Sequence, residues 1–260
     1  MIQRILYCIL LAQPIWAGNC FATSIVAIRS PDSVVIAADS LLTIKNGKGQ
    51  DTTRSECKIF RSGRIFFSFT GFYKEPGSGF DIVSIVSDSL KQGESFGVTV
   101  DKAAMAVVLG MKDEVRRIRK ETPALYEKYF AARTGAILQI LFASYENGVP
   151  MVAVYDIKKT AGPYADIEMS YDRNSCPGNC NVKDTGAYFL TDMRPIEEYL
   201  KREKLKSMPT EKTARFLVDL VIKARTPDTG PPVDVLRIDG KGAAWVEHKA
   251  ECPDISTQDQ

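Results

Sequence analysis

The segment from Thr23 to Ser40 reads TSIVAIRSPDSVVIAADS and decides how the rest of the chain is interpreted. Two apolar runs, 24–28 and 34–38, flank the sequence Ser30-Pro31-Asp32-Ser33. Apolar β-branched runs that are bounded by serine, proline and aspartate are typical of two strands joined by a turn. The segment therefore predicts a β-hairpin at the start of the folded part of the chain.

The apolar spacing outside this hairpin predicts further strands and helices. Their order along the chain is strands, helices, strands, helices, strands, which favours antiparallel sheets covered by helices over alternating βα units. We found no repeats or linkers and therefore expect one domain. We expect strands at 58–60, 64–69, 136–143, 150–155, 233–238 and 243–246, helices at 81–90, 101–119, 195–204 and 210–223, an exposed loop at 46–49, and irregular structure at 163–181.

The composition excludes several classes of protein. The chain has 260 residues, of which 45% are hydrophobic and 25% charged, as in folded globular proteins rather than disordered or multi-span membrane proteins. The net charge of +2 gives no general electrostatic attraction for nucleic acid or for a membrane surface. The single histidine, His248, argues against a histidine-cluster metal site and leaves only one candidate for a Ser/His/Asp triad. We expect no metal and no cofactor, and a hydrolase would need another base.

The first 22 residues have the organisation of a secretory signal peptide. Arg4 precedes the apolar run 5–12, which is too short to span a bilayer, and small residues follow at Ala17 and Ala22. Cleavage after either alanine fits the pattern, and Asn19 is a poor match for lipidation at Cys20. We therefore expect an exported protein, periplasmic or secreted, with no other membrane association.

Export would leave four cysteines in the mature chain, namely Cys57, Cys176, Cys180 and Cys252. Disulfides persist in oxidising compartments, so one or two bridges are expected. Four cysteines allow three pairings, and the spacing does not choose among them.

The segment 23–40 resembles the opening of a mature proteasome β subunit or its bacterial relatives, which are N-terminal-nucleophile (Ntn) hydrolases. Thr23, Asp39 and Ser40 occupy the places of the family's nucleophilic threonine and of the Asp-Ser pair that ends its first hairpin. The stretch 58–71, from Lys58 to Gly71, resembles the segment that carries the family's active-site lysine. The resemblance implies an α+β fold, a four-layer αββα sandwich over residues 23–248, with a C-terminal tail at 249–260.

The resemblance also implies an active site. Thr23 would be the nucleophile and would have its own α-amine as base, because a threonine hydroxyl is weak unless a base accepts its proton. Lys58 would lower the pKa of that amine, and Asp39 would hold Lys58 in its charged form. The Gly71 N–H would stabilise the oxyanion. Three further residues would form an outer polar shell that orients the amine: Thr185, Asp228 and Thr229.

The implied activity is hydrolysis of a peptide or small amide by an exported threonine hydrolase. The alternative is a catalytically silent family member that acts as a binding or assembly subunit. Three departures from the family keep both hypotheses open: Thr226 stands where the family has an acid, Ala22 rather than Gly precedes Thr23, and Phe72-Tyr73 with an insertion through Gly79 replaces small pocket residues. Assembly into a homo-oligomer is left open as well. If Lys58 tunes the Thr23 amine, we expect Lys58→Ala to abolish hydrolysis and to leave the fold largely intact.

Overall fold

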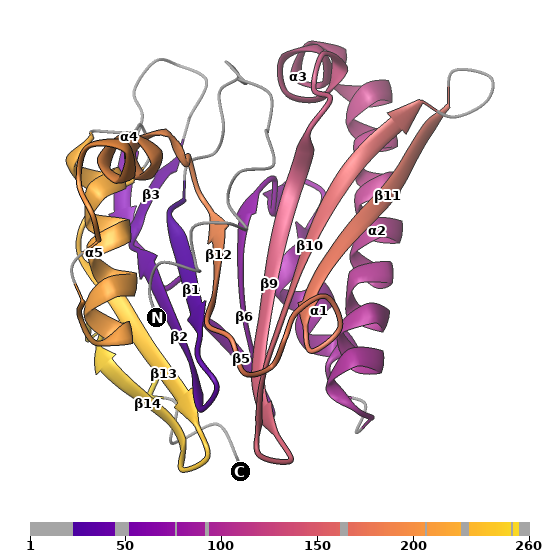
Figure 1. Cartoon of the computed structure of the whole chain (residues 1–260). Helices are drawn as coiled ribbons and strands as arrows, with labels where there is room; N and C mark the ends of the chain where they lie inside the picture. The colour runs from indigo at the N-terminus through magenta and orange to yellow at the C-terminus, as the bar shows by residue number, and fades with distance from the viewer. Residues whose placement is uncertain are drawn as a thin grey trace.

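The computed structural model describes residues 23–44, 52–75, 77–91, 94–161, 166–205, 207–224, 229–250 and 252–254. The predicted signal peptide at 1–22 and the predicted loop at 46–49 lie outside these residues. Within them, the chain forms two large antiparallel sheets with helices on both outer faces (Figure 1).

The first sheet is built around the predicted hairpin. Its strand order is β12 (Gly186–Leu190), β1 (Ile25–Arg29), β2 (Ser33–Asp39), β13 (Val233–Asp239) and β14 (Gly242–Glu247). Both β1 and β2 are buried along their whole length, because the first strand of the chain lies inside the sheet and both of its faces are covered. The two predicted hairpins of this sheet, at 24–38 and 233–246, are thereby confirmed.

The second sheet is dominated by a long hairpin. Its strand order is β11 (Ile167–Cys176), β10 (Val149–Ala161), β9 (Ala136–Glu146), β6 (Ile65–Gly71) and β5 (Phe60–Ser62). Asn147 and Gly148 have positive φ angles of 51° and 80° between β9 and β10, which is the conformation that an Asn-Gly hairpin turn requires. Two small sheets add the pairs β3 (Leu41–Ile44) with β4 (Thr52–Ser55) and β7 (Lys74–Glu75) with β8 (Phe80–Asp81).

Strand β11 corrects the prediction of irregular structure at 163–181. It pairs with β10 over ten residues, from Ile167 opposite Ala161 to Cys176 opposite Val152. Ile167 and Met169 are buried against the helices, whereas most of the strand is polar because it forms the edge of its sheet. The polar edge obscured the alternation that identifies a strand.

The four predicted helices are present; the last has the predicted bounds, and the ends of the other three are shifted. They are α1 (Ile82–Ser89), α2 (Phe96–Glu121), α4 (Arg194–Arg202) and α5 (Thr210–Lys223). The side chain of Asp81 accepts a hydrogen bond from the Val83 N–H at 2.9 Å and so caps α1. Unpredicted short elements follow α2, namely α3 (Pro123–Tyr126) and a π-helical turn, η2 (Glu127–Ala131).

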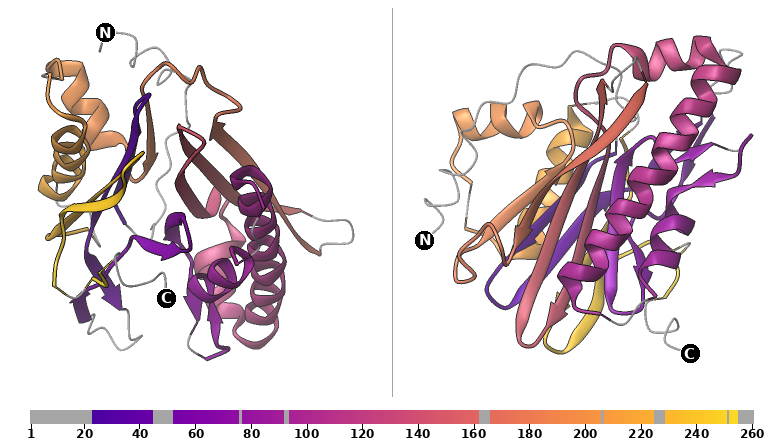
Figure 2. Two further views of the ribbon diagram at one scale, coloured as in Figure 1. Left: turned by 90° about the horizontal axis from the view of Figure 1, so that it is seen from below. Right: turned by 90° about the vertical axis from the view of Figure 1, so that its right-hand side faces the viewer.

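Three apolar clusters hold the layers together. One lies between the two sheets and includes Ile36 of β2 and Leu141 of β9. A second joins α1 and α2 to the outer face of the β9–β10 sheet, and a third joins α4 and α5 to the outer face of the β1–β2 sheet. The two further views show the same layer order, helices, sheet, sheet, helices (Figure 2). The predicted fold class, a four-layer αββα sandwich, is confirmed.

Among the described residues, no helix has the length and apolar character that are needed to cross a membrane.

Two disulfides resolve the pairing that the spacing left open. Cys176 pairs with Cys180, four residues away, and Cys57 pairs with Cys252, 195 residues away. The second bridge joins the C-terminal segment to the residue before Lys58. Lys249 and Cys252, which the sequence assigned to the tail, are both buried.

We predict that the two disulfides differ in their contribution to stability. In the chain-entropy model, a bridge across about 200 residues contributes ~5 kcal/mol, whereas one across a few residues contributes ~2 kcal/mol. The double substitution Cys57→Ala, Cys252→Ala should therefore lower the free energy of unfolding in urea more than Cys176→Ala, Cys180→Ala does. An equal or larger loss in the second variant would contradict this prediction.

Candidate functional site

The register of the first sheet brings four chain segments to one edge. Ile25 of β1 lies opposite Ala38 of β2 and opposite Leu190 of β12. On the other side of β2, Asp39 lies opposite Val233 of β13. The start of β1, the end of β2, the end of β12 and the residues just before β13 therefore meet.

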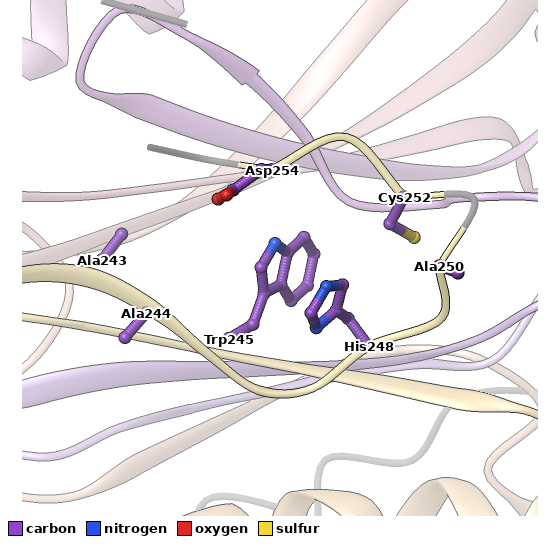
Figure 3. A pocket seen from close by; sticks show the side chains of 7 residues that line it. All are labelled: Ala243, Ala244, Trp245, His248, Ala250, Cys252 and Asp254. Atoms are coloured by element: carbon purple, nitrogen blue, oxygen red, sulfur yellow. The ribbon is translucent and has the colours of Figure 1, made fainter. Parts of the chain in front are cut away.

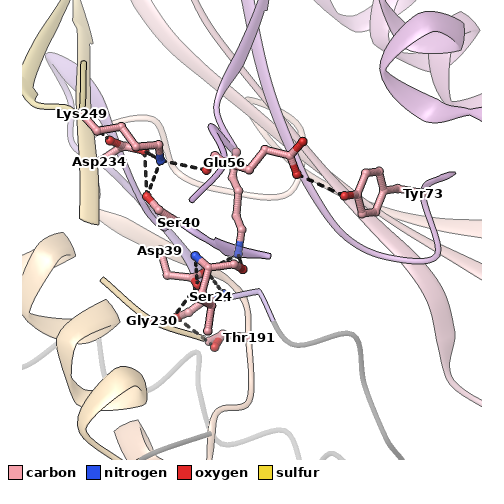
Figure 4. Close-up of polar contacts among 11 residues, drawn as sticks. Ser24, Asp39, Ser40, Glu56, Tyr73, Thr191, Gly230, Asp234 and Lys249 are labelled. Atoms are coloured by element: carbon pink, nitrogen blue, oxygen red, sulfur yellow. Dashed lines mark hydrogen bonds and ion pairs between the residues drawn. The ribbon is translucent and has the colours of Figure 1, made fainter. Parts of the chain in front are cut away.

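Asp39 is the central residue of this edge. Its side chain is fully buried, and its Oδ1 accepts hydrogen bonds from the Ser24 N–H and from Lys58 Nζ, both at 2.8 Å. Its Oδ2 accepts from the N–H of Gly230 at 3.0 Å and from that of Leu41 at 3.2 Å. A buried carboxylate requires such donors, because burial without them strongly disfavours its charge. Figure 4 shows this carboxylate between Ser24 and Gly230.

Lys58 reaches Asp39 from residues 56–59, which link β4 to β5 and belong to no strand. Its side chain is 9% exposed, and its ammonium also donates to the Leu41 carbonyl at 2.7 Å. Burial lowers the pKa of Lys58 below its ordinary value, and the Asp39 carboxylate opposes this shift. The sequence-predicted pair of Lys58 and Asp39 is thus in direct contact.

Thr23 is the residue next to Ser24, one of the donors to Asp39. It is partly exposed, and the residue after it, Ser24, is fully buried and fixed by Asp39. Two donors that share one carboxylate oxygen lie within about 6 Å of each other. The Lys58 ammonium is therefore close to the peptide group that joins Thr23 to Ser24.

Thr185 lies far from Thr23. It precedes β12, and β12 runs antiparallel to β1, with Gly186 opposite Arg29. Arg29 donates to the carbonyl of Asp184 at 3.0 Å, which fixes this segment at the other end of β1. Thr185 is therefore separated from Thr23 by the length of a strand, and it cannot belong to the polar shell that we expected around Thr23.

Thr191, and not Thr185, lies beside the residue that follows Thr23. It directly follows β12, and its hydroxyl donates to Ser24 Oγ at 3.1 Å. Figure 4 shows the two side chains facing each other. Sequence reasoning missed Thr191 because Thr185 is followed by glycine, as the family motif requires, whereas Thr191 is followed by aspartate.

The other predicted residues have different outcomes. Thr229 is buried and precedes Gly230, so it lies beside the Asp39 contact. Asp228 lies outside the described residues. Gly71 ends β6 with a φ of 116°, and a Cβ atom there would lie 2.3 Å from the carbonyl oxygen of Ile137. Packing against β9 therefore requires glycine at 71, whether or not its N–H has a chemical role.

The insertion after Gly71 also reaches the site. The hydroxyl of Tyr73 donates to the Glu56 carboxylate at 3.3 Å, two residues before Lys58. Burial and the neighbouring Glu56 carboxylate raise the pKa of this phenol well above its usual range. Tyr73 therefore stays neutral and acts as a donor at physiological pH.

A cavity of about 460 Å³ opens beside β14, where Trp245 and His248 stack with ring centroids 5.4 Å apart (Figure 3). One residue that lines this cavity, Cys252, is also linked to the Asp39 cluster, because its disulfide partner Cys57 is next to Lys58. Both sulfur atoms are used in that bridge, so the group of Cys57, Asp234 and Cys252 is not a metal site in this form of the protein. The cavity and the Asp39 cluster are distinct features.

No protein-family model matches the chain, and no curated protein matches it. Among solved structures, the chain is similar to Anbu from Hyphomicrobium sp. strain MC1, with 16% identity and a TM-score of 0.46. The match covers 87% of this chain and 86% of that one.

Because Lys58 and Asp39 are both buried, we expect substitution of either residue to lower the free energy of unfolding. Removing one partner of a buried ion pair costs about 3–5 kcal/mol, because the other charge loses its compensation. Asp39→Ala also leaves three backbone N–H groups without their acceptor. Lys58→Met leaves Asp39 with those three donors, so a smaller loss of about 1–3 kcal/mol is expected.

We therefore predict that both variants are less stable than the wild type and that Asp39→Ala is the less stable of the two. Urea unfolding monitored by circular dichroism measures both losses, and Asp39→Asn, which keeps acceptor capacity, is the matched control. Wild-type stability in Asp39→Ala would show that the carboxylate does not hold these segments together.

Proposed function

We propose that the chain is an exported threonine hydrolase that cleaves the amide bond of a peptide or small amide, with Thr23 as its N-terminal nucleophile. One observation carries the proposal. A single buried oxygen of Asp39 binds both the Lys58 ammonium and the N–H of the residue after Thr23. A chain that begins at Thr23 would place its α-amine and hydroxyl beside a fixed positive charge.

The chemistry follows from these groups. The Thr23 hydroxyl attacks the carbonyl carbon of the substrate, and its proton passes to the α-amine, whose unperturbed pKa is about 7.7–8.0. The proton then passes to the leaving amine, which departs and leaves an ester on Thr23. Water hydrolyses this ester and restores the hydroxyl.

The remaining residues have supporting roles in this proposal. Lys58 favours the neutral α-amine and the developing negative charge, because a nearby ammonium disfavours further positive charge. Asp39 orients Lys58, and Thr191 fixes Ser24 through its hydroxyl. The Gly71 N–H is the proposed oxyanion donor. Thr229 and Asp228 are the proposed neighbours of the amine.

Export is supported by the two disulfides, since such bridges form and persist in oxidising compartments. It also supplies the free amine that the mechanism requires. Signal cleavage after Ala22 would expose Thr23, whereas cleavage after Ala17 would leave Gly18 to Ala22 in front of it. We therefore propose Thr23 as the first residue of the mature protein.

We predict that activity requires a free N-terminus at Thr23. Mass spectrometry of the exported wild type should show Thr23 as its first residue, and Gly18 as the sole first residue would contradict the proposal. One extra residue before Thr23 should abolish amide hydrolysis, because an amide nitrogen cannot accept the proton.

Two substitutions separate the hydroxyl from the amine in the same assay. Thr23→Ser keeps both groups and should retain part of the activity, whereas Thr23→Ala should have none. Circular dichroism confirms that each variant is folded. Activity in Thr23→Ala would eliminate the threonine mechanism, and an inactive wild type across a broad peptide panel would favour the silent-subunit alternative.

The contact of Thr191 with Ser24 gives a further prediction about kcat. Thr191→Val keeps the shape of the side chain but removes its hydrogen bond to Ser24, and such a bond contributes about 0.5–1.5 kcal/mol. We expect kcat to fall about 3- to 10-fold. Thr185→Val is the matched control and should change kcat less than twofold. A larger loss of kcat in Thr185→Val than in Thr191→Val would contradict the proposal that Thr191, rather than Thr185, supports the site.

A further inference from the structure

A second buried lysine lies next to the Asp39 site. The side chain of Lys249 is 5% exposed, and that of its partner Asp234 is 1% exposed. Lys249 Nζ donates to Asp234 Oδ2 at 2.7 Å and to the Glu56 carbonyl at 2.8 Å, and it also contacts Ser40 Oγ. Figure 4 shows this group beside the Asp39 cluster. Burying an ammonium is costly, and a well-packed apolar side chain would stabilise the fold as well, so stability alone does not explain it.

Each partner of Lys249 is close in sequence to a residue of the candidate site. Ser40 follows Asp39, and Asp234 follows Val233, which lies opposite Asp39. Glu56 is two residues before Lys58, and its N–H donates to the Ser40 carbonyl at 2.8 Å. Lys249 therefore joins the end of β2, the start of β13 and the segment that carries Lys58.

The disulfide between Cys57 and Cys252 also holds the segment 56–59 in place. Cys57 is adjacent to Lys58, and its partner Cys252 donates its N–H to the Lys249 carbonyl at 3.1 Å. Residues 56–59 belong to no strand, so no sheet ladder holds their backbone. Lys249 and Cys252 supply the fixed points that a strand would otherwise provide.

We propose that Lys249 and Cys252 form a C-terminal clamp that holds Lys58 against Asp39, with Lys249 as a positioning residue for the proposed hydrolysis. The inference rests on the proposed function for its kinetic consequence. Its structural part, the placement of Lys58, stands independently of any activity.

The clamp also acts on the charge of Lys58. Among the described residues, the charged groups that act on this ammonium are Asp39, Lys249 and Glu56. Burial is the main cause that lowers the pKa of Lys58, and the positive charge of Lys249 lowers it further, while Asp39 and Glu56 oppose the shift. Loss of Lys249 removes a like charge and admits water. Both effects raise the pKa of Lys58, and they outweigh a weaker contact with Asp39 because burial is the largest cause of the shift.

The test compares Lys249→Met with the matched control Lys241→Met, a substitution of an exposed lysine in the turn between β13 and β14. Full-length chains are exported and the mature proteins purified. NMR of the lysine Nζ groups, with Lys58 assigned through Lys58→Arg, gives the pKa of Lys58 in each protein. Hydrolysis of the best peptide amide from a panel gives kcat and KM.

In Lys249→Met we expect a higher pKa of Lys58 and a kcat lowered about 10- to 100-fold with a nearly unchanged KM, because a small displacement of a catalytic group costs that much. Lys241→Met should match the wild type. An unchanged pKa of Lys58 in folded Lys249→Met would overturn the proposal.

Two further outcomes are covered, namely that Lys249→Met does not fold and that the wild type is inactive. If Lys249→Met does not fold, Cys252→Ala removes the covalent half of the clamp, and a shift in the pKa of Lys58 is expected there too, with no shift overturning the proposal. If the wild type hydrolyses no peptide, the proposed function fails, and the pKa of Lys58 in Cys252→Ala, where Lys249 keeps its charge, still decides whether the clamp places Lys58.

Discussion

The buried carboxylate of Asp39 is the interaction on which the rest of the site depends. It accepts hydrogen bonds from Ser24, Leu41, Lys58 and Gly230, which come from four separate segments of the chain. A buried charge tolerates little movement of its donors, because each lost donor leaves part of the charge uncompensated. The carboxylate thus fixes where the N-terminal segment lies, where Lys58 points, and how the chain enters β13.

Both large sheets contribute residues to this site. The first sheet supplies, through its strand register, the meeting of Ser24, Asp39 and Thr191 at one edge. The second supplies Lys58 from the irregular residues before β5, and the apolar cluster between the sheets keeps the two parts together. The positive charge therefore reaches Asp39 only when the layers are stacked.

The sequence predicted what local patterns determine. The hairpin of β1 and β2 follows from a local pattern, and the antiparallel sheets covered by helices follow from the order of the elements. The four layers and the contact of Lys58 with Asp39 were implied by the family resemblance of segments 23–40 and 58–71. Thr185 was misplaced because the next residues, Gly-Ala-Tyr-Phe-Leu, form β12 and carry the chain along β1 before Thr191 reaches the site. Lys249 was missed because its contacts join residues up to 209 positions apart, a separation that no local pattern encodes.

The bridge between Cys57 and Cys252 has a consequence for the timing of assembly. Synthesis proceeds from the N-terminus, so Lys58, the last of Thr23, Asp39 and Lys58, leaves the ribosome nearly two hundred residues before Cys252 does. Until Lys249 and Cys252 have been added, the segment that carries Lys58 lacks both its disulfide and the Lys249 contacts. A chain that stops before Lys249 therefore holds Thr23, Asp39 and Lys58 but lacks the contacts that keep residues 56–59 in place.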